Sequence, residues 1–191
     1  MTADQWLETI HREFNQESDR AAAIVATAML EESLKVLLRK RLGEPCSPRE
    51  DILEGDQAPL QSFSAKINAA VQLGAISAHM ARDLHLIRRI RNDFAHHPLN
   101  LTFESERIRN RVRALDEGSN YNSRNPATRA AIGPPGARWD FLGVAAWMLY
   151  SLHREADEIG RLERHRPEFG YVEWDRLPEQ LRQFLRDDEA T

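Results

Sequence analysis

The residues with the clearest chemical potential lie in an arginine-rich segment that ends at Pro98. Within it, Arg91 and His96 have four residues between them. Arginine carries a permanent, forked charge that matches phosphate oxygens, and histidine can transfer a proton near neutral pH. With Asn92 beside the arginine and His97 beside the histidine, this pair could handle a phosphate group. The structural alternative is that both histidines cap the free carbonyls of a helix that the proline terminates.

The helix that carries Arg91 has one apolar arc, and at ~100° per residue Arg91 falls inside it. On an earlier helix, Glu31 also lies within the apolar arc. Because an unpaired buried charge is very costly, we expect Arg91 and Glu31 to approach each other across the packed helices. The alternative is that either side chain extends past its neighbours into solvent.

The position of His96 is less favourable for joint action with Arg91. Five helical residues turn through about 140° beyond a full turn. The two side chains would therefore converge only if the helix loosens after Phe94, which Pro98 encourages by disfavouring helical backbone at His97.

Helical periodicity dominates the chain, and no alternating pattern typical of a strand stands out. The predicted helices cover residues 4–17, 19–42, 62–73, 77–95, 104–116 and 139–164, with a short amphipathic piece at 178–186. A polar loop at 118–136 precedes the last core helix and is long for a compact domain. We therefore expect an all-α single domain over residues 1–160. A charged C-terminal extension over 161–191 would pack on this domain or trail from it.

Composition narrows the classes of protein. The chain has 191 residues and a formal net charge of −4, so nucleic-acid binding would need a local basic patch. A single cysteine, Cys46, excludes an intramolecular disulfide and a cysteine-rich zinc site. No paired histidines with zinc-ligand spacing and no glycine-rich phosphate loop occur, so we expect no metal and no cofactor. The absence of a secretory signal and of a long apolar run predicts a cytoplasmic protein that does not enter a membrane.

One predicted helix carries a series of alternating arginines, Arg107, Arg109, Arg111 and Arg113. Alternate residues of a helix point apart, so these side chains would surround the helix and not form one face. The pattern favours a solvated helix over a nucleic-acid interface.

Four segments in order resemble the mannitol operon repressor family: 29–34, 59–67, 73–76 and 86–96. The similarity runs from about residue 20 to 160. Proteins of that family are all-helical and lack a recognisable DNA-binding motif. The segment from Arg91 to His96 is also similar to the signature of the HEPN superfamily, an arginine followed by a polar residue and, four to six residues after the arginine, by a histidine. The resemblance implies a HEPN-like helical bundle.

Many HEPN proteins are metal-independent ribonucleases that act as homodimers, whereas others are inactive binding modules. The resemblance implies that His96 acts as general acid or base while an RNA 2′-hydroxyl attacks the adjacent phosphate, leaving a 2′,3′-cyclic phosphate. Arg91 would stabilise charge on the phosphorus, and Asn92 would orient a phosphate or His96. Glu31 would hold Arg91, a role that comes from the helical arcs and not from the motif. Dimerisation would let Arg91 of one subunit act with His96 of the other.

Two functions remain open. The first is a HEPN-type endoribonuclease, as in toxins and defence components, with RNA as substrate and an antitoxin as partner. The second is a non-catalytic regulator of the mannitol-repressor type that acts through protein contacts. A DNA-binding repressor is the weakest candidate, because no recognition helix can be assigned.

Overall fold

The first element that the sequence dictates clearly is α2, Asp19–Leu42, and the computed structural model gives it the predicted bounds. The structure describes residues 5, 9, 12–14, 16–45, 47, 51–96, 101–115, 136–163 and 176–188. In these ranges the secondary structure is helical and no strand occurs, so the prediction of an all-α protein is confirmed. The chain divides into two units, residues 1–161 and 162–191, which are described separately.

Helix α2 has clear start and stop signals. The Ser18 hydroxyl accepts a hydrogen bond of 3.1 Å from the backbone N–H of Ala21, which caps the first turn. At the other end Gly43 adopts a φ of 82°, a left-handed conformation that favours glycine, and its N–H donates to the carbonyl of Arg39. Between these ends the helix buries a stripe of leucines and alanines.

The next two helices form a hairpin-like pair against α2. Helix α3 is Phe63–Gln72 and α4 is Ala78–His96. Each begins at a serine hydroxyl that accepts a backbone hydrogen bond of 3.1 Å, Ser62 for α3 and Ser77 for α4. Gly74 lies between them at φ 64° and allows the chain to reverse.

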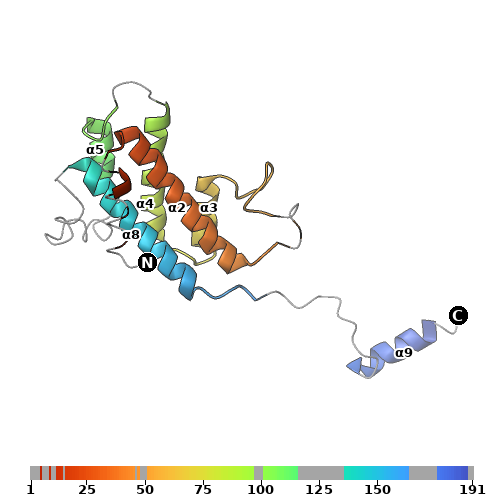
Figure 1. Ribbon diagram of the computed structural model, residues 1–191. Coiled ribbons are helices and arrows are strands. Elements are labelled where there is room, and N and C mark those ends of the chain that lie inside the picture. Colours follow the sequence, from red (N-terminus) through yellow and green to blue (C-terminus); the bar gives the residue numbers. More distant parts are fainter. Residues whose placement is uncertain are drawn as a thin grey trace. The chain divides into compact units, whose positions relative to one another are not determined.

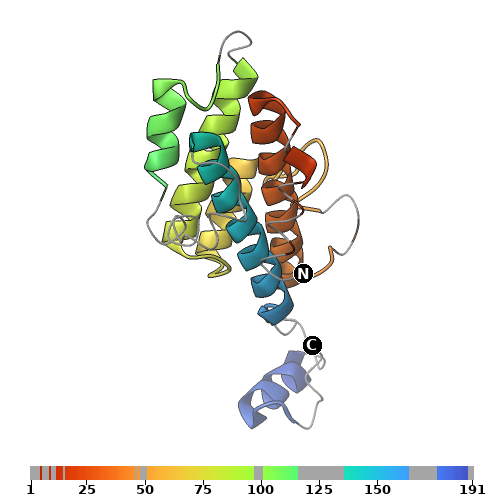
Figure 2. The same cartoon turned by 60° about the vertical axis from the view of Figure 1, so that its left-hand side comes forward.

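The first unit is completed by α5, Glu106–Arg113, and α8, Ala137–Glu158. Helices α2 and α8 lie side by side in the same direction, and α4 runs antiparallel to them (Figure 1). Helix α5 packs against α4 and α8, on the side of α4 away from α2 (Figure 2). Helix α4 thus packs against three other helices, α2, α3 and α5.

Two contacts hold distant parts of the first unit together. The guanidinium of Arg138, at the start of α8, donates to the carbonyls of Phe14 and Glu17, each at 2.6 Å, and to the carboxylate of Asp19 at 2.5 Å. Phe103 lies between Phe94 and Phe141, with ring centroids 5.1 Å from each. These contacts join the start of α2, the end of α4 and the start of α8.

Two predicted boundaries differ from the structure. The prediction that the last core helix continues to residue 164 is wrong: α8 ends at Glu158, because Ile159 has extended backbone and Gly160 follows it. The predicted helix 104–116 is shorter at both ends, at Glu106–Arg113. Of the predicted helix 4–17, residues 5, 9 and 12–14 are helical, residues 16–17 are not, and the rest lie outside the described residues. The long loop at 118–136 lies almost wholly outside them.

The second unit contains α9, Glu179–Asp188. Its first turn is anchored by the carbonyl of Pro178, which accepts hydrogen bonds from the N–H groups of Leu181 and Arg182. Among the described helices of both units, none is long and apolar enough to cross a membrane.

Candidate functional site

The sequence-predicted site lies on the last turns of α4. Arg91 and Asn92 are half-buried there, and His96 is exposed as the final residue of the helix. Asp93 and Phe94, between them, are buried. The terminal turns are therefore anchored on one side and present polar side chains on the other. His97 lies outside the described residues.

The structure does not bring Arg91 and His96 onto one face of a single helix. Helix α4 remains α-helical through His96, so the loosening after Phe94 that would let the two converge does not occur. A regular helix separates positions five residues apart by about 140°. One copy of the chain therefore offers an arginine and a histidine that point in different directions.

The expected pair of Arg91 with Glu31 is wrong. Glu31 Oε1 instead accepts a hydrogen bond of 2.9 Å from the Nζ of Lys66 on α3, and within the described residues no ion pair joins Glu31 to Arg91. The helical arcs of α2 and α4 correctly turned both residues inward, but they could not show that α3 supplies a closer cation. In the same ranges the guanidinium of Arg91 has no hydrogen-bond or ion-pair partner.

A buried charge cluster around Asp93 of α4 was missed by sequence reasoning. The carboxylate of Asp93 is only 9% exposed, accepts a hydrogen bond of 2.6 Å from Arg107 Nη2, and forms an ion pair with Arg111. These arginines are four residues apart and so share one face of α5. The signal that could have found them is an acidic residue next to Phe94 on a core helix, followed in the next helix by arginines at this spacing.

The expectation that α5 is a solvated helix surrounded by arginines is therefore wrong for one of its faces. Arg107 and Arg111 face Asp93, and Ile108 and Val112 are buried. Arg82 of α4 makes a further link, donating at 2.7 Å to the carbonyl of Ala114 just after α5. Arg113 is exposed and Arg109 half-buried. The arginine-rich pattern thus combines helix-to-helix contacts with cationic groups at the surface.

Helices α4 and α5 are rich in positive charge although the chain as a whole is acidic. Together these helices carry eight arginines against three acidic residues, in a chain whose formal net charge is −4. The pKa of His85 lies below its usual value because of burial and, in addition, because the charges of Arg88 and Arg89 disfavour its protonated form. These two helices therefore carry a net positive charge, although three of their arginines, Arg82, Arg107 and Arg111, are engaged in contacts between the helices.

Comparison of the chain with family models, with curated proteins and with solved structures finds no match in any of the three. The site must therefore be interpreted from its own geometry. That geometry provides a guanidinium without a partner among the described residues, an exposed imidazole at a helix end, and two arginines of α5 held against Asp93.

Proposed function

We propose that this chain is a metal-independent endoribonuclease of the HEPN type, whose reacting groups are Arg91 and His96. The observation that carries the proposal is the half-buried guanidinium of Arg91, which has no partner in the described part of the chain and lies beside an anchored turn. A guanidinium in such a place is favoured when a phosphate completes its hydrogen bonds.

The chemistry assigned to these residues is a transesterification. The 2′-oxygen of a ribose forms a bond to the adjacent phosphorus while the bond from phosphorus to the 5′-oxygen of the next nucleotide breaks. His96 accepts the 2′-hydroxyl proton or donates a proton to the leaving oxygen, and Arg91 stabilises the charge on the phosphoryl oxygens. The products are a 2′,3′-cyclic phosphate and a free 5′-hydroxyl.

The proposal requires two copies of the chain. Because Arg91 and His96 diverge on a regular helix, Arg91 of one subunit acts with His96 of the other across a homodimer. The arginine-rich surface of α4 and α5 would hold the RNA backbone near this composite site, and Asn92 would orient a phosphate.

The test is RNA cleavage by the purified chain in EDTA, with Arg91→Ala and His96→Ala as the deleterious variants. Each is expected to reduce cleavage at least a hundredfold, since positioned proton transfer and charge stabilisation contribute roughly that much. Arg154→Ala, an exposed arginine on α8, is the matched control and should cleave normally. Normal cleavage by His96→Ala would refute the catalytic interpretation.

Mixing the two inactive variants tests the composite site directly. After subunits exchange, half of the dimers pair one variant with the other, and each such dimer regains one of its two sites. Activity should return to about a quarter of the wild-type level for a two-fold dimer. No recovery, despite proven exchange of subunits, would show that the site is not shared.

A second candidate function is a non-catalytic regulator that acts through protein contacts. It is supported by three exposed apolar side chains on α2, Ile24, Val25 and Val36. Surfaces of this kind commonly mark protein interfaces. This candidate predicts a partner complex that survives Arg91→Ala and His96→Ala but is weakened by Val25→Glu.

A further inference from the structure

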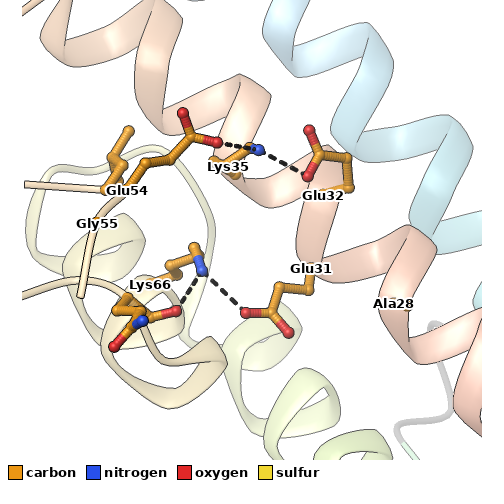
Figure 3. Close-up of a pocket in the computed structure, with 9 residues that line it drawn as sticks. Ala28, Glu31, Glu32, Lys35, Glu54, Gly55 and Lys66 are labelled. Atoms are coloured by element: carbon orange, nitrogen blue, oxygen red, sulfur yellow. Dashed lines mark hydrogen bonds and ion pairs between the residues drawn. The ribbon is translucent and has the colours of Figure 1, made fainter. Parts of the chain in front are cut away.

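A polar cavity of about 400 Å³ lies between the middle of α2, the start of α3 and the segment that leads into α3. Figure 3 shows five charged side chains around it: Glu31, Glu32, Lys35, Glu54 and Lys66. Ala28 and Leu53 add small apolar surfaces. This volume lies within the range of small-molecule sites. Neither Arg91 nor His96 lines this cavity.

The positive groups of the cavity are already well supplied with partners. The Nζ of Lys66 donates to Glu31 Oε1 at 2.9 Å and to the carbonyl of Gln61 at 2.6 Å, and its side chain is only 7% exposed. The Nζ of Lys35 lies 2.6 Å from Glu54 Oε1 and 2.8 Å from Glu32 Oε2. Each ammonium group therefore has two oxygen partners and little remaining capacity for an anion.

The negative groups have acceptors to spare. Within the described residues, the second carboxylate oxygens of Glu31 and Glu32 accept no hydrogen bond. That of Glu54 has only the guanidinium of Arg39, at 4.0 Å. Three carboxylates face two ammonium groups, so the lining also has one unbalanced negative charge. The side chains of Glu32 and Glu54 are 62% and 57% exposed, so a ligand that brings positive charge and N–H donors can reach these oxygens from solvent.

We propose that the cavity binds a small aliphatic amine cation, of the diamine or polyamine class. Ammonium groups at the ends of such a ligand would meet the spare oxygens of Glu31 and Glu32, and its methylene chain would lie along Ala28 and Leu53. A bare divalent metal ion fits less well, because it needs several oxygens converging at about 2.3–2.6 Å, and the ammonium groups interleaved here would repel it. The proposal does not depend on ribonuclease activity.

The experiment is calorimetric titration of the full chain with spermidine at fixed ionic strength. We expect one bound spermidine per chain, with affinity reduced at least tenfold in Glu32→Gln, whose exposed carboxylate can be changed without disturbing the core. Glu158→Gln, an exposed carboxylate at the end of α8, should bind as the wild type does. Ala28→Leu, at an exposed position that lines the cavity, should abolish binding while thermal stability is retained.

Two further arms decide what kind of ligand the cavity takes. Arginine replaces spermidine to test a guanidinium, and MgCl₂ at matched ionic strength tests a simple cation. Stronger binding of spermidine than of both supports the amine assignment. Absence of binding, equal binding of Mg²⁺, or equal weakening by Glu32→Gln and Glu158→Gln would each overturn it, the last two by showing only general attraction to an acidic chain.

Discussion

Asp93 of α4 accepts a hydrogen bond of 2.6 Å from Arg107 of α5, so the helix that carries the candidate site is fixed by a charge on its neighbour. The carboxylate is nearly buried, whereas the Arg107 side chain is 55% exposed. Removal of such a partly solvent-screened ion pair lowers the free energy of unfolding by less than removal of a fully buried ion pair. We expect Asp93→Asn to lower the free energy of unfolding by about 1–3 kcal/mol, measured by urea denaturation.

Glu106→Gln is the control for this prediction, because Glu106 is an exposed carboxylate in the first turn of α5. Its effect should stay within about 0.5 kcal/mol. An equal loss in both variants would mean that the burial of Asp93 has no special energetic role.

Arg138 should be irreplaceable by lysine. Its planar guanidinium reaches two backbone carbonyls and the Asp19 carboxylate at once, a geometry that a single ammonium group cannot reproduce. We expect Arg138→Lys to lose most of the stability that Arg138→Ala loses, about 2–3 kcal/mol by analogy with other charge-assisted hydrogen bonds. Thermal and urea unfolding provide the measurement, and full stability of Arg138→Lys would contradict the prediction.

Phe103 should be the most sensitive residue of the connection between α4 and α5. It is 1% exposed, and its ring packs in a tilted arrangement between those of Phe94 and Phe141. Phe103→Ala removes both ring contacts and leaves a cavity, so we expect a loss of about 3–5 kcal/mol. Phe103→Leu, which retains much of the volume, should lose clearly less. Similar losses in the two variants would show that volume does not determine the effect.

The segment before α3 should loosen in acid. The carboxylate of Asp51 accepts hydrogen bonds from Arg39 at 2.5 Å and from the N–H of Leu53 at 2.8 Å. The pKa of Asp51 lies below its ordinary value of 3.8, chiefly because of the hydrogen bond from Arg39. A carboxyl with a lowered folded pKa contributes stability that is fully present above its ordinary pKa and is lost as the pH falls through the folded value.

We therefore expect the Leu53 amide to lose protection against hydrogen exchange as the pH falls below 3.8, after correction for the intrinsic exchange rate. Asp51→Asn should show low protection at both ends of this range, with little dependence on pH. A wild-type protection factor that stays constant through the acid range would contradict the assigned role of Asp51.

Local signals predicted the helices well, because their information is contained within a few residues. Ser18 and Gly43 mark both ends of α2, and Ser77 marks the start of α4. The end of α8 was missed because the periodic pattern continues past Glu158, while the extended backbone of Ile159 ends the helix. The charged residues around Glu158 do not indicate that the backbone becomes extended at Ile159.

For the candidate site, the sequence predicted which residues face inward and which face solvent, but it did not predict their partners. A helical arc shows that Glu31 points inward, but the choice between Arg91 and Lys66 as its partner depends on which helix lies nearest. The burial of Asp93 depends likewise on α5, which covers a second face of α4. Such choices are made by tertiary packing between helices, and no periodicity within one helix records them.

The side-by-side placement of α2 and α8 has a consequence for synthesis on the ribosome. Helix α2 is synthesised early, whereas α8, Ala137–Glu158, which packs against it, is synthesised much later. At about 5–20 residues per second, translation of the roughly one hundred residues between them takes about 5–20 s. During that interval, the apolar side chains of α2 that pack against α8 in the folded protein remain exposed. A chaperone that binds apolar helices could bind the nascent chain at these side chains.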